Sequence, residues 1–273
     1  MREDLDEILG IFPIHQQHQG RVAAAIGELE TQMPRAASYP ASDFAPAPRA
    51  GALHFLAPVE DQEIWAAGVT YEQSRAARQE EAQDGGDIYA RVYSAERPEL
   101  FFKAAGWRVV PPGSAVGIRA DASWSVPEPE LGVLFNPAME VVGFAVGNDM
   151  SSRDIEGENP LYLPQAKIYN RSCALGVGIL LNPATDWPSA EICVRIKRQG
   201  TLAFEGAAHT SRIKRSLLEL AEYLGRCYSF PEGVLLLTGT GTVPPPDFTL
   251  AVGDVIRIEI EGIGELTNLV QLT

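Results

Sequence analysis

The sequence predicts an α+β fold that is mainly β, with a few short helices. Apolar and polar residues alternate over short segments, turn residues separate these segments, and one stretch has a clear helical period. No regular strand–helix–strand rhythm is present, so a doubly wound parallel sheet is not expected. The chain has 273 residues, 45% of them hydrophobic, which is enough for a sizeable core. We therefore expect a mainly antiparallel or mixed β core.

The N-terminal part of the chain differs from the rest. Residues 21–33 have an amphipathic helical pattern, and residues 34–52 are dense in proline and alanine without any period. The second stretch is typical of an extended linker. We expect residues 1–62 to form a small N-terminal region and residues 63–273 to form the main domain.

The strands are predicted in chain order from their apolar patterns. Residues 141–149 form an apolar run of strand length that ends at an aspartate. Residues 192–197 alternate, Gln199-Gly200 then turns the chain, and residues 201–204 form the partner strand of a hairpin. Residues 256–261 alternate as a half-buried strand does.

The clear helix is predicted over residues 211–224. Ser211 is the expected N-cap and Gly225 the expected C-cap, because serine and glycine are preferred at these two ends. One face of this segment is apolar, with Ile213, Leu217, Leu218, Ala221 and Leu224.

Charge and composition exclude several classes of function. The net charge of −14 argues against binding nucleic acid or an anionic membrane. Three cysteines form no CxxC pair, and four histidines lack zinc-ligand spacing apart from the pair His15 and His18. The acidic N-terminus lacks the features of a signal peptide, and no apolar run is long enough for a membrane helix. We expect a cytoplasmic protein without thiol or zinc chemistry.

A pair of glutamates is the first candidate site. Glu128 and Glu130 are spaced i, i+2, so on a strand they would share one face about 7 Å apart. Pro127 and Pro129 flank Glu128, which excludes a helix interior or a fully paired central strand. Two inward-facing carboxylates would need a cation, whereas a solvated edge strand would need none. Both alternatives remain open on this motif alone.

Asp149 favours the metal site over the edge strand. It ends the apolar strand one hairpin after Glu128 and Glu130, which would place the three carboxylates together. Three carboxylates without imidazole or thiolate suit Mg²⁺, with Mn²⁺ or Ca²⁺ as substitutes. The alternative for Asp149 is an aspartate that caps a turn.

Two further segments could take part in this site. Lys167 follows 18 residues after Asp149, and beside a divalent ion its pKa would fall, which would allow a neutral amine base. Alone, it would be an ordinary surface lysine. Residues 238–242, ThrGlyThrGlyThr, follow a buried apolar run and could bring backbone N–H groups and hydroxyls against a carboxylate, or form only a tight turn.

Five segments together resemble the fumarylacetoacetate hydrolase superfamily, in the superfamily's order over roughly residues 65–270. This resemblance implies a mixed β-sandwich or β-roll core and a metal ion held by Glu128, Glu130 and Asp149. It also implies a substrate chelated through its 2-oxo acid group. The segments are residues 128–133 (GluProGluLeuGlyVal), 143–154 (GlyPheAlaValGlyAsnAspMetSerSerArgAsp), the GlnAlaLys that ends at Lys167, 236–240 (LeuLeuThrGlyThr) and 253–268.

One departure separates the branches of this superfamily. Hydrolytic members usually carry GlyLeuAsnTyr, two further residues and then a histidine that activates water; here Ser74 stands at that position. Residues 70–74, 88–93, 97–104 and 154–167 are instead similar to the 2-keto-3-deoxy-D-arabinonate dehydratases. We expect a lyase of that kind. The alternatives are an acylpyruvate hydrolase or oxaloacetate decarboxylase of the same superfamily, and a scaffold without activity.

The dehydratase resemblance implies a mechanism with Lys167 and Glu99 as the catalytic pair. With the 2-oxo acid group on Mg²⁺, Lys167 would remove the C3 proton to give a metal-stabilised enolate, and Glu99 would protonate the leaving C4 hydroxyl. A surface ion pair between Glu99 and Lys103 is the alternative for these two residues. Arg91, Tyr162 and residues 74–90 would set specificity, and residues 72–97 would form a lid. Homodimers or dimer-based tetramers are also implied. The residues expected to bind the substrate are Thr240, Lys103, Arg91 and Ser151.

Overall fold

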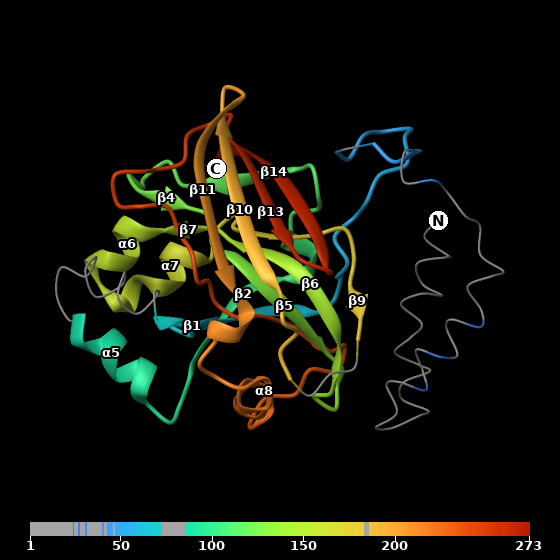
Figure 1. The fold of residues 1–273 in the computed structure, drawn as a ribbon, viewed down its shortest axis with the longest axis vertical. Coiled ribbons are helices and arrows are strands. Elements are labelled where there is room, and N and C mark those ends of the chain that lie inside the picture. Colours follow the sequence, from blue (N-terminus) through green and yellow to red (C-terminus); the bar gives the residue numbers. More distant parts are fainter. Residues whose placement is uncertain are drawn as a thin grey trace.

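The computed structural model describes residues 43–45, 47–72, 86–182 and 186–273, together with isolated positions before residue 43. Its body consists of two packed β-sheets with short helices at their margins (Figure 1). Apart from isolated positions, the helical pattern of residues 21–33 and much of the segment at 34–52 lie outside the described residues. The division of the chain at residue 62 stays a prediction.

The larger sheet has seven strands among the described residues, in the order β2-β1-β12-β5-β6-β8, with β9 also paired to β6. Strands β1 and β12 pair in parallel, and the other neighbours are antiparallel. The sheet is therefore mixed, as predicted. Its strands are β1 (Glu63–Gly68), β2 (Glu99–Ala105), β5 (Pro129–Phe135), β6 (Val141–Asp149), β8 (Cys173–Leu175), β9 (Leu180–Leu181) and β12 (Val234–Leu237).

The second sheet has five described strands in the order β11-β10-β13-β14-β3, of which only the pair β14 and β3 is parallel. A short two-stranded sheet, β4 with β7, lies beside the site described below. These strands are β3 (Ala115–Ile118), β4 (Ser125–Val126), β7 (Ser151–Ser152), β10 (Glu191–Arg198), β11 (Thr201–His209), β13 (Val255–Ile260) and β14 (Gly264–Leu272).

The helices are short, and no helix in the described part of the chain is long and apolar enough to cross a membrane. In Figure 1, α5, α6 and α7 lie on one side of the sheets. The α-helices are α5 (Gly86–Ser94), α6 (Arg153–Glu158), α7 (Leu163–Lys167) and α8 (Leu217–Gly225), and the 3-10 helices are η3 (Gly106–Arg108), η4 (Pro160–Tyr162) and η5 (Thr210–Arg212).

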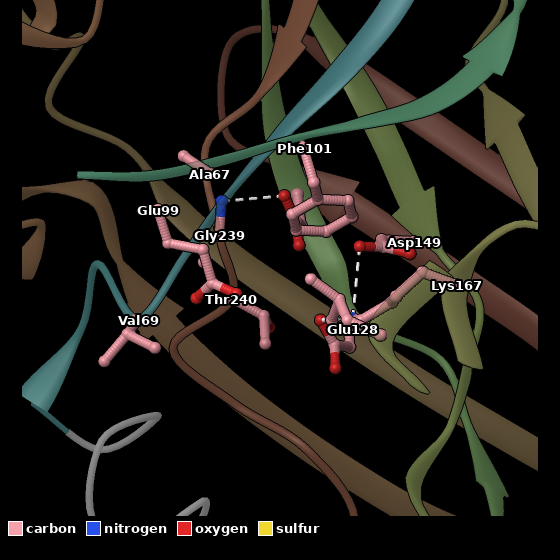
Figure 2. Close-up of a pocket in the computed structure, with 12 residues that line it drawn as sticks. Ala67, Val69, Glu99, Phe101, Glu128, Asp149, Lys167, Gly239 and Thr240 are labelled. Atoms are coloured by element: carbon pink, nitrogen blue, oxygen red, sulfur yellow. Dashed lines mark hydrogen bonds and ion pairs between the residues drawn. The ribbon is translucent and has the colours of Figure 1, made fainter. Parts of the chain in front are cut away.

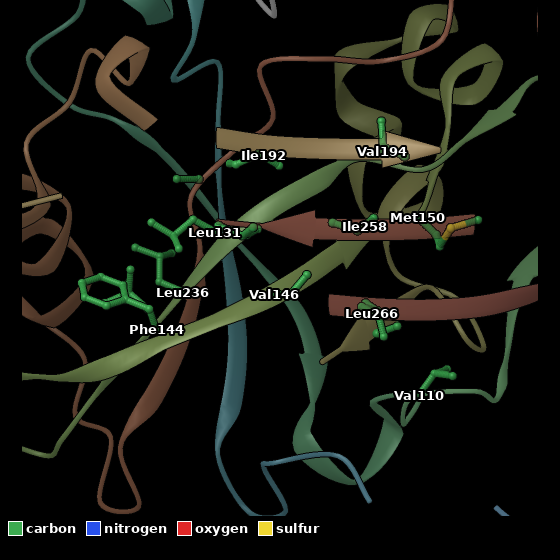
Figure 3. Packing of buried hydrophobic residues seen from close by; sticks show 14 of the residues in the cluster. Val110, Leu131, Phe144, Val146, Met150, Ile192, Val194, Leu236, Ile258 and Leu266 are labelled. Carbon is green, nitrogen blue, oxygen red and sulfur yellow. The ribbon is translucent and has the colours of Figure 1, made fainter. Parts of the chain in front are cut away.

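The main core lies between the two large sheets (Figure 3). Leu131 of β5 and Val146 of β6 belong to the same buried cluster as Ile192 of β10 and Ile258 of β13. Successive side chains of a strand point to opposite faces, so every second residue of each strand enters this layer. Full burial of such a side chain stabilises the fold by about 1.5–3 kcal/mol.

Strands β5 and β6 are buried along their whole length, because a second apolar cluster covers their other face. They are antiparallel, with Glu130 opposite Gly147 and Pro129 opposite Asn148. The first residues of β5 therefore lie beside the last residues of β6. This is the edge at which the acidic residues gather.

The predicted strands at 141–149, 192–197 and 256–261 are confirmed, and their ends differ from the predicted ones by at most one residue. The hairpin at Gln199-Gly200 is also confirmed, and its second strand continues from the predicted end at Phe204 to His209.

The predicted start of the helix at Ser211 is wrong. The helix begins at Leu217, and its N-cap is Ser216, whose hydroxyl accepts a hydrogen bond from the Glu219 backbone N–H at 3.1 Å. Ser211 itself lies in the 3-10 helix η5, and the β-bridge of Ile213 with Tyr71 separates η5 from the α-helix. Gly225 is the last helical residue.

Candidate active site

Three buried carboxylates converge at the junction of β5 and β6. Glu128 lies between β4 and β5, Glu130 is in β5, and Asp149 ends β6; each is at most 2% exposed. One carboxylate oxygen from each lies within 4.8 Å of the others. We call these three residues the carboxylate cluster. Its burial excludes the solvated edge strand considered above, and Asp149 is the last residue of strand β6.

The proline pattern around Glu128 has the effect that the sequence predicted. Pro129 is the first residue of β5, where a missing N–H costs no ladder bond. The pairing of β5 with β12 begins only at Gly132, so the first residues of β5 pair with β6 alone. The backbone N–H of Asp149 donates to the carbonyl of Glu128 at 3.0 Å, which ties the two segments together.

Three buried cations face the carboxylate cluster. Lys167 Nζ lies 2.8 Å from Glu128 Oε2 and 3.2 Å from Asp149 Oδ2. Arg153 lies 3.0 Å from Glu128 Oε1, and Lys103 forms an ion pair with Asp149 Oδ1. Because buried charges are costly unless they are paired, these contacts offset part of the cost of burying three carboxylates.

Glu130 is held differently from the other two carboxylates. Its Oε2 accepts a hydrogen bond from the backbone N–H of Gly239 at 2.7 Å. Burial, followed by the neighbouring charges of Asp149 and Glu128, raises the pKa of Glu130 well above 4.5. A divalent cation among the three carboxylates would remove this repulsion, and hard oxygen ligands of this kind suit Mg²⁺. The donor set therefore fits the predicted metal.

Lys167 ends helix α7, and its amine points into the carboxylate cluster (Figure 2). The Lys167 amine also donates to the hydroxyl of Ser151 at 2.6 Å, and that hydroxyl donates to the Asp149 carbonyl at 3.1 Å. Ser151 therefore positions Lys167 in this structure. Its predicted contact with a substrate stays a prediction.

Lys103 is completely buried. Its amine donates to the carbonyls of Met150, at 3.0 Å, and Lys167, at 2.5 Å, besides pairing with Asp149. A surface ion pair of Lys103 with Glu99 is thus excluded. Lys103 supports Asp149 and the end of α7, and its predicted substrate contact stays a prediction.

A pocket opens over the carboxylate cluster, and Figure 2 shows its two sides. Glu128, Asp149 and Lys167 lie on one side in this view, and Val69, Glu99 and Thr240 lie on the other. The remaining lining is mostly apolar or without a side chain, from Ala67, Gly68, Phe101, Leu163 and Gly239, together with Glu130.

Glu99 enters the pocket from β2, where it pairs with Gly68 of β1. A Cβ atom on Gly68 would lie 2.1 Å from Glu99 Oε2, closer than any real contact. Because glycine has no Cβ atom, position 68 provides room for the Glu99 carboxylate. The sequence drew attention to Glu99 through the resemblance alone, and Gly68 was not predicted as part of the site.

The ThrGlyThrGlyThr segment does bring a backbone N–H against a carboxylate, and that carboxylate is Glu130. Gly239 has a φ of +88°, and a Cβ there would lie 2.1 Å from Thr70 Oγ1, so glycine is required. Thr240 lines the pocket, and its hydroxyl donates to the carbonyl of Thr242 at 2.9 Å.

The described contacts do not connect three of the predicted residues or segments to the site. Arg91 is an exposed residue of α5 and is not part of the described pocket lining. Tyr162 is 37% exposed in η4, next to the lining residue Leu163. Ser74 and most of residues 74–90 lie outside the described residues. Arg153 was not predicted as a site residue, although it lies in the segment 143–154 that resembles the superfamily.

Fold and site together define a mixed β protein with a buried carboxylate centre for a hard divalent cation. Residues 63–271 match the family model described as the fumarylacetoacetate (FAA) hydrolase C-terminal domain. The chain belongs to this family.

Two curated relatives match most of the chain. It is 49% identical to a probable 2-keto-3-deoxyxylonate dehydratase of Haloferax volcanii over 218 residues, which cover 80% of this chain and 75% of the relative. It is 40% identical to the 2-dehydro-3-deoxy-D-arabinonate dehydratase of Saccharolobus solfataricus over 223 residues, with the same coverage.

A solved structure is similar over the same part of the chain. It is a 2-keto-3-deoxy-D-arabinonate dehydratase complexed with magnesium and 2,5-dioxopentanoate. It has 38% identity and a TM-score of 0.72, and the match covers 79% of this chain and 75% of that one.

Proposed function

We propose that this protein is a magnesium-dependent hydro-lyase that dehydrates a 2-keto-3-deoxy sugar acid. The substrate is a pentonate such as 2-keto-3-deoxy-D-arabinonate, and the products are the 2,5-dioxo acid and water. The observation that carries this proposal is the arrangement of the pocket, with an amine at the carboxylate cluster and the carboxyl of Glu99 on the other side. The names of the two curated relatives support the substrate class.

The carboxylate cluster would hold the metal ion. When bound, a divalent cation supplies Lewis-acid polarisation of the substrate's 2-oxo group, which acidifies the C3 hydrogens. The protein's own residues then have to move two protons. They also have to hold the substrate, for which Thr240 in the pocket lining is a candidate.

Lys167 takes the proton from C3 as a neutral amine, the form that a divalent cation beside it favours. Its amine lies within hydrogen-bond distance of Glu128, Asp149 and Ser151, so its position is fixed from three directions. Lys103 fixes the backbone of the same residue through its bond to the Lys167 carbonyl. A base held in this way is pre-oriented, which lowers the entropic cost of proton transfer.

Glu99 donates a proton to the C4 hydroxyl, which leaves as water. The electron pair of the former C3–H bond forms the C3=C4 bond. C5 then loses a proton and C3 regains one, which gives an enol with a C4=C5 double bond. This enol loses its hydroxyl proton and gains a proton at C4, which gives the aldehyde of the 2,5-dioxo acid. Dehydration does not need an activated water. This agrees with Ser74 at the position where hydrolytic members of the superfamily usually have a water-activating histidine.

The test is turnover of 2-keto-3-deoxypentonates with Mg²⁺ and with EDTA, beside an acylpyruvate control. We expect the dioxo acid to form only with Mg²⁺, and no pyruvate to form from the control. Release of pyruvate from the acylpyruvate would instead favour the hydrolase alternative and end the dehydratase proposal.

We also propose that the protein is cytoplasmic and forms a homodimer or a dimer-based tetramer. The resemblance to the superfamily supports both statements. Light scattering on the purified protein would measure the oligomeric state, and a monomer at micromolar concentration would contradict the proposal. Fractionation of the source cells would test the location.

A further inference from the structure

Val69 has a backbone conformation that its side chain does not favour. It follows β1 directly and has a φ of 52°, in the left-handed region. A β-branched residue is a genuine outlier there, because its Cβ substituents crowd the backbone. Such strain persists only where the surrounding structure enforces it, and it is concentrated at functional sites.

The chain is fixed on both sides of Val69. Before it, Gly68 pairs with Glu99 in the β1–β2 ladder. After it, the Thr70 hydroxyl donates to the Thr238 carbonyl at 2.7 Å, and the Lys214 backbone N–H donates to the Thr70 carbonyl at 3.0 Å. The backbone at Val69 therefore cannot relax without breaking bonds to two other parts of the fold.

Val69 lies at the pocket and outside the three packed apolar clusters found among the described residues. It is 5% exposed. The Glu99 carboxylate lies beside Gly68, the residue before Val69, in the space that a Cβ atom on Gly68 would take. Figure 2 shows Val69 on the same side of the pocket as Glu99, away from Lys167 and Asp149.

We propose that Val69 is a specificity-determining residue, whose isopropyl group contacts the distal end of the substrate and limits its chain length. This inference rests on the proposed function. With the 2-oxo acid group at the carboxylate cluster and the C4 hydroxyl at Glu99, the carbons beyond C4 lie next to Val69. Glycine or asparagine would adopt the same backbone at lower cost, so the valine is retained for its side chain.

The experiment compares kcat/KM for a five-carbon and a six-carbon 2-keto-3-deoxy acid in Val69→Ala and Val69→Gly. Alanine removes the isopropyl group but keeps the unfavourable backbone, whereas glycine removes both. We expect each variant to raise the ratio of six-carbon to five-carbon activity about 10-fold, the discrimination that a small apolar contact supplies. Val69→Leu, which fills the pocket further, should lower the ratio.

A matched control separates the site from the backbone effect. Gln199 has a φ of 51° in the exposed turn between β10 and β11, so Gln199→Gly makes the same backbone change far from the pocket. This variant should keep the wild-type ratio. Titration with Mn²⁺ should give wild-type affinity in all the variants, because the carboxylate cluster is untouched, and this checks that they are folded.

The outcomes are distinct. An unchanged ratio in both Val69→Ala and Val69→Gly, in proteins that still bind Mn²⁺, would overturn the inference. A change in Val69→Gly alone would overturn it too, since backbone freedom would then be the cause. If Val69→Ala does not fold, Val69→Leu decides by the direction of its shift. Failure of the wild-type protein to dehydrate either acid would refute the proposed function instead.

Discussion

Lys167 forms ion pairs with two members of the carboxylate cluster, Glu128 and Asp149. Its replacement by alanine should leave metal binding intact or stronger, because a positive charge leaves the neighbourhood of the cation. Turnover should fall about 10²–10⁴-fold, the usual contribution of a positioned base. Steady-state kinetics and a metal titration on the same sample would measure both.

The matched control for this variant is Lys197→Ala on the exposed face of β10, which should keep wild-type turnover. Near-wild-type activity in Lys167→Ala would exclude Lys167 as the base. Loss of the metal together with the activity would mean that the lysine acts structurally.

The raised pKa of Glu130 predicts how pH acts on the metal-free protein. Its causes are burial first, then Asp149 and Glu128. Between 4.5 and the raised pKa, the folded protein binds a proton that the unfolded chain has lost. The contribution of this group to stability is therefore complete below 4.5 and disappears as the pH rises through the folded pKa.

A metal ion competes for the same carboxylate, so its affinity should rise with pH over this range, with release of a proton. Calorimetric titration between about pH 5 and pH 8 in two buffers of different ionisation enthalpy would measure both quantities. An affinity independent of pH, with no proton released, would show that Glu130 is already ionised.

The sequence predicted the carboxylate cluster and Lys167 because these residues stand in motifs with a recognisable order. It did not predict the roles of Lys103 and Arg153. A lysine or arginine is usually exposed, whereas these two are buried and form ion pairs with Asp149 and Glu128. Their partners lie 25 to 46 residues away in the chain, so no local pattern reveals them.

At the scale of elements, the segment before α8 is the clearest departure from the sequence pattern. Its apolar residues have a helical period from Ile213, but Ile213 bridges to Tyr71 and Lys214 bonds to Thr70. Tertiary pairing overrides the local period there, and Ser216 then offers a second N-cap. A helical period therefore predicts the presence of a helix more reliably than it predicts the residue at which the helix begins.

The same segment anchors the end of helix α5. The guanidinium of Arg215, 7% exposed, donates to the carbonyls of Val92, Ala95 and Glu96 at 2.7–3.1 Å and pairs with Glu219. Arg215→Ala would leave these carbonyls without their charged donor. We expect a loss of about 2–3 kcal/mol in the free energy of unfolding.

Urea denaturation would measure this loss, with Arg226→Ala as the matched control. Arg226 forms an i, i+4 pair with Glu222 on the exposed face of α8, and such pairs contribute about 0.3–0.5 kcal/mol. Equal effects of the two substitutions would contradict the anchoring role of Arg215. Since α5 leads into β2, we also expect Arg215→Ala to lower turnover through Glu99.

At the scale of the whole molecule, the sequence predicted a mixed β core but not its strand order. The hairpin of β10 and β11 is local and therefore predictable. The parallel pairing of β1 with β12 joins Glu63 to Val234, and no pattern in either segment specifies it. This pairing brings Gly239 and Thr240 from the end of β12 to the end of β1, so that Thr240 and Val69 lie on the same side of the pocket.

The carboxylate cluster joins two segments of the fold, residues 128–130 and the end of β6, so metal binding should stabilise the molecule. At a free Mg²⁺ concentration about 100 times the dissociation constant, the gain is about 2.7 kcal/mol, if the unfolded chain does not bind the metal. Differential scanning fluorimetry should show a melting temperature that rises with Mg²⁺ concentration and falls with EDTA. Glu128→Ala should lose the metal and with it this response. A melting temperature independent of Mg²⁺ in the wild-type protein, or an equal response in Glu128→Ala, would place the metal elsewhere.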